Sequence, residues 1–165
     1  MRLYVLLSGL INVMADLLNP LNLFALAFEV LIKSLFALAI IKMLNEISEK
    51  NRRITPVLVW LLVIPGFNVL WNFFIALRLS QSLKEELDER NFEVQGKPTL
   101  FIGLAYAIVW SLALFIPPSK NVQHSLIYGV VVIAAIVTFA QYWMKINWYK
   151  KVLQDDMVEN DKEQS

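Results

Sequence analysis

The sequence places a carboxylate and an ammonium group four residues apart in an otherwise apolar stretch. Glu29 and Lys33 lie near the middle of residues 26–41, "LAFEVLIKSLFALAII". On a helix, residues four apart are neighbours, and Glu before Lys is the favourable order for an ion pair. Ionisable side chains inside a membrane span are costly and mark functional sites by default. The spacing therefore predicts an ion pair that either fixes helix register or responds to protons or ions.

Two amide side chains could complete this site. Asn68 and Asn72 lie four residues apart in a second apolar stretch, residues 56–80. If the two stretches are antiparallel spans, counting from the span ends places Glu29 opposite Asn72. The same count places Lys33 opposite Asn68. A lone ion at mid-span costs about 2.5–3.5 kcal/mol on insertion scales, and pairing removes much of that cost. We therefore predict an intramembrane polar cluster of Glu29, Lys33, Asn68 and Asn72.

Other patterns for catalysis or metal binding are absent from the sequence. The chain has no cysteine and one histidine, His124, which we expect in a short loop outside the apolar core. It has no glycine-rich phosphate loop, Gly-x-Ser-x-Gly motif or His-Glu-x-x-His motif. An intramembrane hydrolase needs a nucleophile and a base, and we find no base in the apolar segments. We therefore expect no enzyme activity, no catalytic residue, no metal and no cofactor.

The composition indicates a membrane protein. Hydrophobic residues make up 58% of the chain, whereas soluble domains have roughly 45–50%. The charged residues crowd into residues 42–53, 78–97 and 145–163, with long uncharged runs between them. This alternation is typical of membrane proteins. The net charge of +1 gives no support for nucleic-acid binding.

Four apolar segments are long enough to cross a bilayer, because about 20 helical residues span its ~30 Å hydrocarbon core. They are residues 21–44, 56–80, 99–116 and 125–144, approximately. Backbone groups in lipid must be satisfied within the segment, which favours helices. We predict an all-α integral membrane four-helix bundle in a single membrane domain, residues 1–153. The acidic, polar tail of residues 154–165 is expected to be loosely ordered.

Two segments modify this plan. Pro65-Gly66 lies inside the second predicted span and predicts a kink there. The helical pattern then continues beyond the span, through residues 80–91, into water. Residues 3–18 carry a narrow polar stripe on an apolar helix, which favours an N-terminal interfacial helix lying in the headgroup layer. A membrane crossing by residues 3–18 remains the alternative.

The lysine and arginine residues predict the orientation. With four spans, residues 45–55 fall on one side, and residues 81–98 fall on the other together with both termini. The second side holds more lysine and arginine residues, so the positive-inside rule places it in the cytoplasm. We therefore expect a multi-pass protein with both termini cytoplasmic.

Residues 64–91 resemble a segment of small uncharacterised bacterial inner-membrane proteins. These proteins have a Pro-x-x-Asn-x-x-Trp-x-Phe pattern in one span, followed by Ser-x-Ser-Leu-x-x-Glu and an arginine. The matching residues are Pro65, Asn68, Trp71, Phe73, Ser80, Ser82, Leu83, Glu86 and Arg90. The resemblance implies a multi-spanning bacterial membrane protein and implies no activity.

Two functions compete on these observations. Small or polar residues recur every fourth position at 68–80 and 103–111, which allows close helix packing within the bundle, with a membrane partner or in a homo-oligomer. This pattern favours a non-enzymatic accessory or scaffold subunit that contacts the lipid bilayer. The alternative is a component of a small transporter or channel that uses the Glu29–Lys33 pair. A water-filled cavity reaching Glu29 would favour the alternative.

Overall fold

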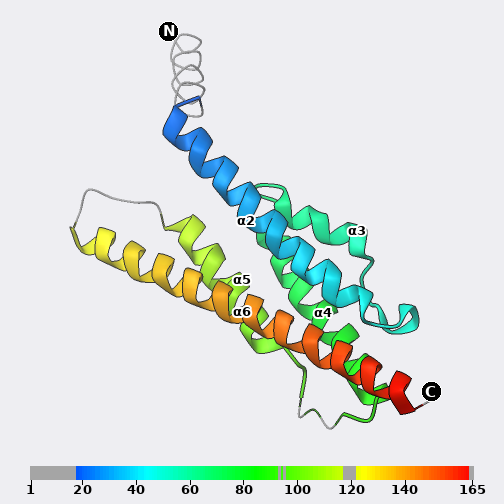
Figure 1. Cartoon of the computed structure of the whole chain (residues 1–165). Helices are drawn as coiled ribbons and strands as arrows, with labels where there is room; N and C mark the ends of the chain where they lie inside the picture. The colour runs from blue at the N-terminus through cyan, green and yellow to red at the C-terminus, as the bar shows by residue number, and fades with distance from the viewer. Residues whose placement is uncertain (1–17, 93, 95, 117–121, 164–165) are drawn as a thin grey trace.

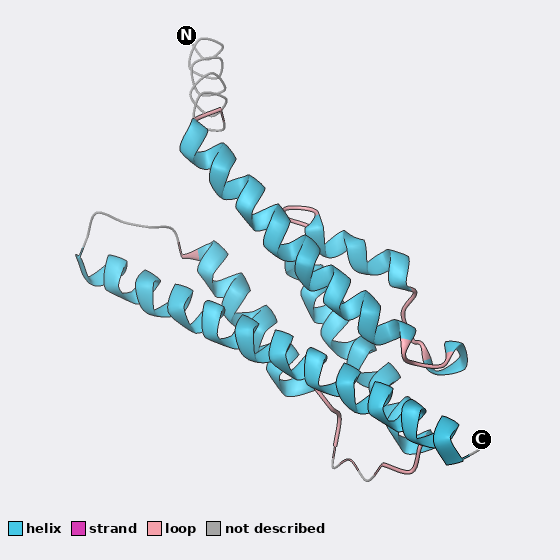
Figure 2. Ribbon diagram, in the orientation of Figure 1, coloured by secondary structure: helices cyan, strands magenta, loops and turns pink. Residues whose placement is uncertain are grey.

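The computed structural model describes residues 18–92, 94, 96–116 and 122–163 (Figure 1). Its elements are α2 (Pro20–Asn45), η1 (Glu49–Asn51), α3 (Pro56–Val59), η2 (Trp60–Val63), α4 (Asn68–Glu89), α5 (Leu100–Phe115) and α6 (Val122–Glu163), where η denotes a 3₁₀-helix. Within the described residues every regular element is a helix (Figure 2), so the predicted all-α fold is confirmed. The expected interfacial helix of residues 3–18 falls outside this part, except for Leu18.

Proline and asparagine define the start of α2. Pro20 occupies the first turn, where its missing N–H leaves no hydrogen bond unmade. The side chain of Asn19 accepts a hydrogen bond from the Leu21 backbone N–H at 3.0 Å, which satisfies one of the free donors of the first turn. From there α2 continues for 26 residues, or about 39 Å at 1.5 Å per residue. It is therefore long enough to cross a bilayer.

The second predicted span is a helical hairpin. The indole N–H of Trp71 donates to the Leu58 carbonyl at 2.9 Å, although these residues would be about 20 Å apart on one continuous helix. The chain reverses at residues 64–67. Pro65 lacks a backbone donor there, and Gly66 has φ +79°, which side-chain-bearing residues avoid. A single kinked span over 56–80 is therefore wrong: the break lies where predicted, but the chain turns back.

This reversal makes α2 and α4 run in the same direction (Figure 1). The backbone N–H of Arg53, in the loop after η1, donates to the Ser82 hydroxyl of α4 at 2.7 Å. The loop of residues 46–53 and the last two turns of α4 therefore lie at the same end of the molecule. The prediction that residues 45–55 and 81–98 lie on opposite sides of a membrane is wrong for this reason.

Helix α6 continues past the predicted fourth span. It has 42 residues, or a length of about 63 Å, and packs antiparallel to α5 (Figure 1). At its start His124 belongs to the first helical turn and not to a loop. Near its end the Gln154 side chain donates to the Glu46 carboxylate at 2.6 Å. This contact attaches the first residue of the predicted tail to the end of α2, and the helix continues to Glu163. The expected loose order of residues 154–165 stays a prediction.

Helices α2, α5 and α6 meet in an aromatic core. The Phe36 ring of α2 lies 5.0 Å from Phe139 and 5.5 Å from Tyr142, both of α6, and 6.3 Å from Tyr106 of α5, between ring centroids. These edge-on contacts are the arrangement that aromatic rings favour. A Cβ on Gly103 of α5 would lie only 2.9 Å from the Ala76 Cβ of α4. The core therefore depends on a glycine where α4 and α5 cross.

Candidate functional site

The Glu29–Lys33 pair lies on the side of α2 that faces α5 and α6. The Lys33 ammonium donates to the Glu29 carboxylate one turn away, and the two side chains form an ion pair. Lys33 is 6% exposed, whereas about a third of the Glu29 side chain, 36%, stays accessible. The ammonium is therefore enclosed, while its carboxylate partner lies at the edge of the packed region.

An aromatic ring completes the surroundings of the Lys33 ammonium. The nitrogen lies 4.7 Å from the centroid of the Trp110 ring on α5, within the range of a cation–π interaction. The same ring lies 6.2 Å from the Tyr106 ring one turn earlier. The Lys33 charge is thus balanced by a carboxylate of its own helix and by the π-face of a residue from another.

A cavity of about 280 Å³ borders this pair. Its walls come from α2, α5 and α6 and comprise Ala25, Phe28, Glu29, Ile32, Lys33, Tyr106, Trp110, Ala135, Ile136 and Phe139. A second cavity of about 210 Å³ shares Trp110, Ala135 and Ile136 with it and extends along α5 and α6. Mostly apolar walls with a few polar groups are typical of small-molecule sites. The arrangement can receive an amphipathic group beside a charge-balanced pair.

Asn68 and Asn72 do not join the pair as predicted. Neither amide lines the cavity. Both are buried in α4, where Asn68 Oδ1 and Asn72 Nδ2 have no hydrogen-bond partner among the described residues. Tyr106 of α5 lies close to Asn72 and itself lines the cavity. The prediction that Glu29 lies opposite Asn72, and Lys33 opposite Asn68, assumed antiparallel helices. In the structure α2 and α4 are parallel.

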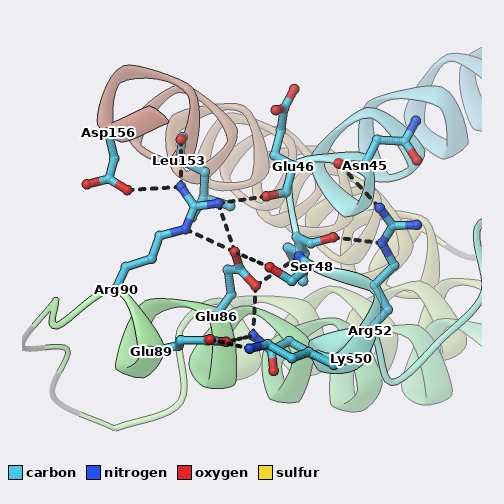
Figure 3. A network of polar contacts seen from close by, with 12 residues as sticks. Asn45, Glu46, Ser48, Lys50, Arg52, Glu86, Glu89, Arg90, Leu153 and Asp156 are labelled. Atoms are coloured by element: carbon cyan, nitrogen blue, oxygen red, sulfur yellow. Dashed lines mark hydrogen bonds and ion pairs between the residues drawn. The ribbon is translucent and has the colours of Figure 1, made fainter. Parts of the chain in front are cut away.

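A second polar site, centred on Glu86, was not recognised as a site from the sequence. This carboxylate is 2% exposed and accepts three hydrogen bonds from the loop after α2 (Figure 3). The backbone N–H of Ser48 donates at 2.9 Å, the Ser48 hydroxyl at 3.2 Å and the Asn51 amide at 2.8 Å. A buried carboxylate requires such partners. The result is a direct connection between the end of α2 and α4.

Arg90 extends this connection to α6. Its guanidinium donates to Glu86 at 2.8 and 2.9 Å, and to the Asp156 carboxylate at 3.0 Å. It also donates to the backbone carbonyls of Leu153 at 2.9 Å and Glu46 at 3.0 Å. Figure 3 shows Arg90 between α4, α6 and the end of α2. One side chain therefore holds three segments that are far apart in sequence.

The network changes the acidity of Glu86. Burial by itself would raise the pKa of this carboxyl, but hydrogen bonds from Asn51, Arg90 and Ser48 favour the charged form. Together with the positive charge of Arg90, these bonds outweigh burial, and the pKa of Glu86 lies below its usual range. Glu86 is therefore a permanently charged acceptor near neutral pH and suits a structural role better than proton transfer.

Further ion pairs attach the loop to the outside of α4. Lys50 pairs with Glu89, and the Asn51 amide also donates to Glu89 at 2.7 Å. Arg53 pairs with Glu85 at 2.8 Å. The sequence contained one signal for this site, because Ser82, Glu86 and Arg90 recur every fourth position on one face of α4. On a helix end that projects into water, as predicted for residues 80–91, this spacing indicates one helix face but does not by itself predict burial.

Five of the nine residues that carry the resemblance of 64–91 lie in the hairpin turn or make the contacts described above. Pro65 lies in the turn, Trp71 closes the hairpin onto Leu58, and Ser82, Glu86 and Arg90 bind the loop or α6. The resemblance itself stays a prediction. Comparison with protein-family models, curated proteins and solved structures finds no match for this chain.

Proposed function

We propose that the chain is a multi-pass protein of the bacterial inner membrane, with α2, α5 and α6 crossing the bilayer and the α3–α4 hairpin entering it from one side. By length and composition, α2 and α6 could each cross a membrane. Val130, Ile133 and Ile136 of α6 are 67%, 63% and 62% exposed, and so large an apolar surface is stable in lipid but not in water. The bacterial assignment rests on the resemblance of residues 64–91.

The charges support one orientation. Apart from Lys33, the lysine and arginine residues of the described segments all lie toward the end where the loop of residues 46–53 meets α4 and α6. The positive-inside rule assigns this end to the cytoplasm. The C-terminal end of α6 is then cytoplasmic, and the Pro20 end of α2 is on the opposite side. The expected cytoplasmic N-terminus concerns residues outside the described part.

Cysteine labelling tests this topology, because the native chain has no cysteine. We expect Glu49→Cys and Asp88→Cys to react with a membrane-impermeant thiol reagent only after the inner membrane is opened. Leu18→Cys should react from outside, because it precedes the opposite end of α2. Reaction of Glu49→Cys and Asp88→Cys from opposite sides of the membrane would overturn the hairpin topology.

We infer that the protein acts as a non-enzymatic accessory or scaffold subunit. The observation that carries this proposal is the Glu86–Arg90 network, which fixes the hairpin to both α2 and α6 at the cytoplasmic end. Beyond it, α6 presents Met157 and Val158, which are 38% and 53% exposed. Adjacent apolar side chains on a water-exposed helix end favour contact with a partner protein or a second copy of the chain.

Photo-cross-linking in intact cells tests the scaffold role. A photoreactive amino acid at Val158 should give a discrete product heavier than the monomer, whose mass identifies a partner or a second copy. The control position is Leu153, which lies on the same helix and is fully buried, so it should give no such product. Only monomer at position 158 would contradict the proposal.

One observation favours the alternative, a component of a small transporter or channel. The cavity of about 280 Å³ beside Glu29 and Lys33 could admit water or a small solute. Ala135→Cys, at the wall shared by both cavities, separates the two functions in the same labelling experiment. A scaffold with a lipid-filled cavity should leave this cysteine unreacted with a small water-soluble reagent. Rapid reaction would favour the transporter component.

A further inference from the structure

A third cavity lies at the charged end of the molecule. Its volume is about 430 Å³. It is formed by α4, by the loop that precedes α3 and by the loop between α4 and α5. The lining residues are Arg53, Arg78, Gln81, Lys84, Glu85, Asp88 and Lys97. Unlike the cavity beside Glu29, this one is bordered almost entirely by charged side chains. Four of the seven are cations.

The two carboxylates of this cavity are already neutralised. Arg53 pairs with Glu85 at 2.8 Å, and Lys84 pairs with Asp88 at 2.9 Å. Because these two pairs cancel, they leave no net charge on the walls. Among the described lining residues, the remaining charge therefore comes from the other two cations.

Arg78 and Lys97 have no carboxylate partner among the described residues. The Arg78 guanidinium donates only to the neutral Gln81 side chain, at 3.3 Å, and lies 5.4 Å from the centroid of the Phe74 ring. Lys97 makes no ion pair within the described segments. Two cations that have no carboxylate partner among the described residues, one from α4 and one from the loop before α5, therefore face one cavity, which favours an anionic ligand.

The cavity lies where the apolar surface of α4 ends. Leu70 and Leu77 are the exposed large apolar residues of this helix, and none follows Leu77. Arg78 comes next, above the ring of Phe74. If α4 enters the bilayer from the cytoplasm, as proposed above, Leu77 touches acyl chains and Arg78 lies at the level of the headgroups.

We propose that this cavity binds the phosphate of an anionic phospholipid of the cytoplasmic leaflet, with Arg78 and Lys97 as the two contacting cations. A guanidinium forms paired hydrogen bonds with phosphate oxygens, and an ammonium adds a point charge. Basic pockets at the cytoplasmic face are suited to anionic headgroups. The adjacent apolar edge of Phe74 and Leu77 favours a lipid over free phosphate. The proposal rests on the membrane topology proposed above.

Native mass spectrometry of the full chain, released from a neutral detergent, tests the site. We expect phosphatidylglycerol to remain bound to the wild-type protein in preference to phosphatidylcholine. The double variant Arg78→Gln/Lys97→Gln should lose about 10- to 30-fold in apparent affinity, since each cation near an anionic surface contributes about fivefold. The matched control is Lys151→Gln, an exposed lysine at the same end but outside the cavity.

Each outcome decides the proposal. Equal retention of the two lipids, or undiminished phosphatidylglycerol binding by the double variant, would overturn it. A parallel titration with inorganic phosphate that displaces the lipid at equal concentration would identify the site as a phosphate site only and would also overturn it. Because the measurement in detergent does not depend on orientation, failure here with normal labelling of Glu49→Cys and Asp88→Cys would reject the lipid site and leave the topology standing.

Discussion

Replacement of Arg90 by methionine is expected to destabilise the protein by about 3–5 kcal/mol, the range for removing one partner of a buried ion pair. The variant leaves Glu86 charged and 2% exposed. It also removes the donors to the carbonyls of Glu46 and Leu153. Chemical or thermal unfolding in detergent, followed by circular dichroism, measures the loss. The C-terminal part of α6 should detach from α4 before the rest unfolds, because Arg90 is its main connection to α4.

The control for Arg90→Met is Lys84→Met on the same helix. Lys84 also pairs with a carboxylate four residues away, Asp88, but the two side chains are 39% and 51% exposed. Exposed pairs contribute about 0–1 kcal/mol, so this variant should unfold close to the wild type. Combining Arg90→Met with Glu86→Gln should cost less than the sum of the two single changes, because the stranded charge is removed. Equal stabilities of Lys84→Met and Arg90→Met would contradict the role of the network.

The same network predicts an acid limit of stability. Because the pKa of Glu86 is lowered on folding, the folded state favours the charged carboxylate. The resulting stabilisation is fully present above the ordinary carboxyl pKa of about 4.3 and is lost as pH falls through the lowered value. Glu86→Gln should therefore flatten the dependence of stability on pH in this acidic range.

Gly103→Ala is expected to destabilise the helical fold by about 1–3 kcal/mol, the range for overfilling a packed core. The added Cβ would lie 2.9 Å from the Ala76 Cβ and 3.0 Å from Tyr142 Cζ. These atoms belong to α4 and α6, so the change would push two helices away from α5. Thermal unfolding in detergent, followed by the fluorescence of the five tryptophans, gives the measurement.

Gly129→Ala is the matched control for Gly103→Ala. Gly129 lies within α6, and a Cβ there would meet nothing within 4 Å. Alanine favours a helix over glycine by about 1 kcal/mol, so this variant should be as stable as the wild type or slightly more stable. If Gly103→Ala were to match Gly129→Ala, the close contact of α4, α5 and α6 would not determine stability.

The sequence predicted helix positions far better than their connections. The apolar runs locate α2, α5 and the first part of α6, because burial in lipid or core requires a continuous helical segment. Pro65-Gly66 located the break in the second run. Neither hydropathy nor periodicity gives the direction in which the chain continues after a break. That direction follows from bonds between distant residues, such as Trp71 to the Leu58 carbonyl, which no local pattern reveals.

The candidate site shows the same division. The Glu29–Lys33 contact follows from a spacing of four on one helix, and a local rule is sufficient for it. The contribution of Trp110 and the separate location of Asn68 and Asn72 depend on how three other helices pack. Glu86 and Arg90 stand four residues apart on one helix, but the burial of Glu86 results from the loop of residues 46–53 folding over it. An error in the direction of one helix therefore hid the most extensive polar site of the described chain.

The turn at residues 64–67 has a consequence for how the chain is made. The helical segment before it, α3 with η2, covers eight residues, or about 14 Å. The apolar start of α4, up to Leu77, is about 15 Å long. Neither arm could traverse the bilayer during synthesis, so Lys50, Arg52 and Arg53 never need to be translocated. The irregular backbone of the turn is tolerated in the hydrocarbon region only where other helices cover it, so the hairpin must pack after those helices are in place. In the proposed topology its insertion is a late folding step and not a translocation event.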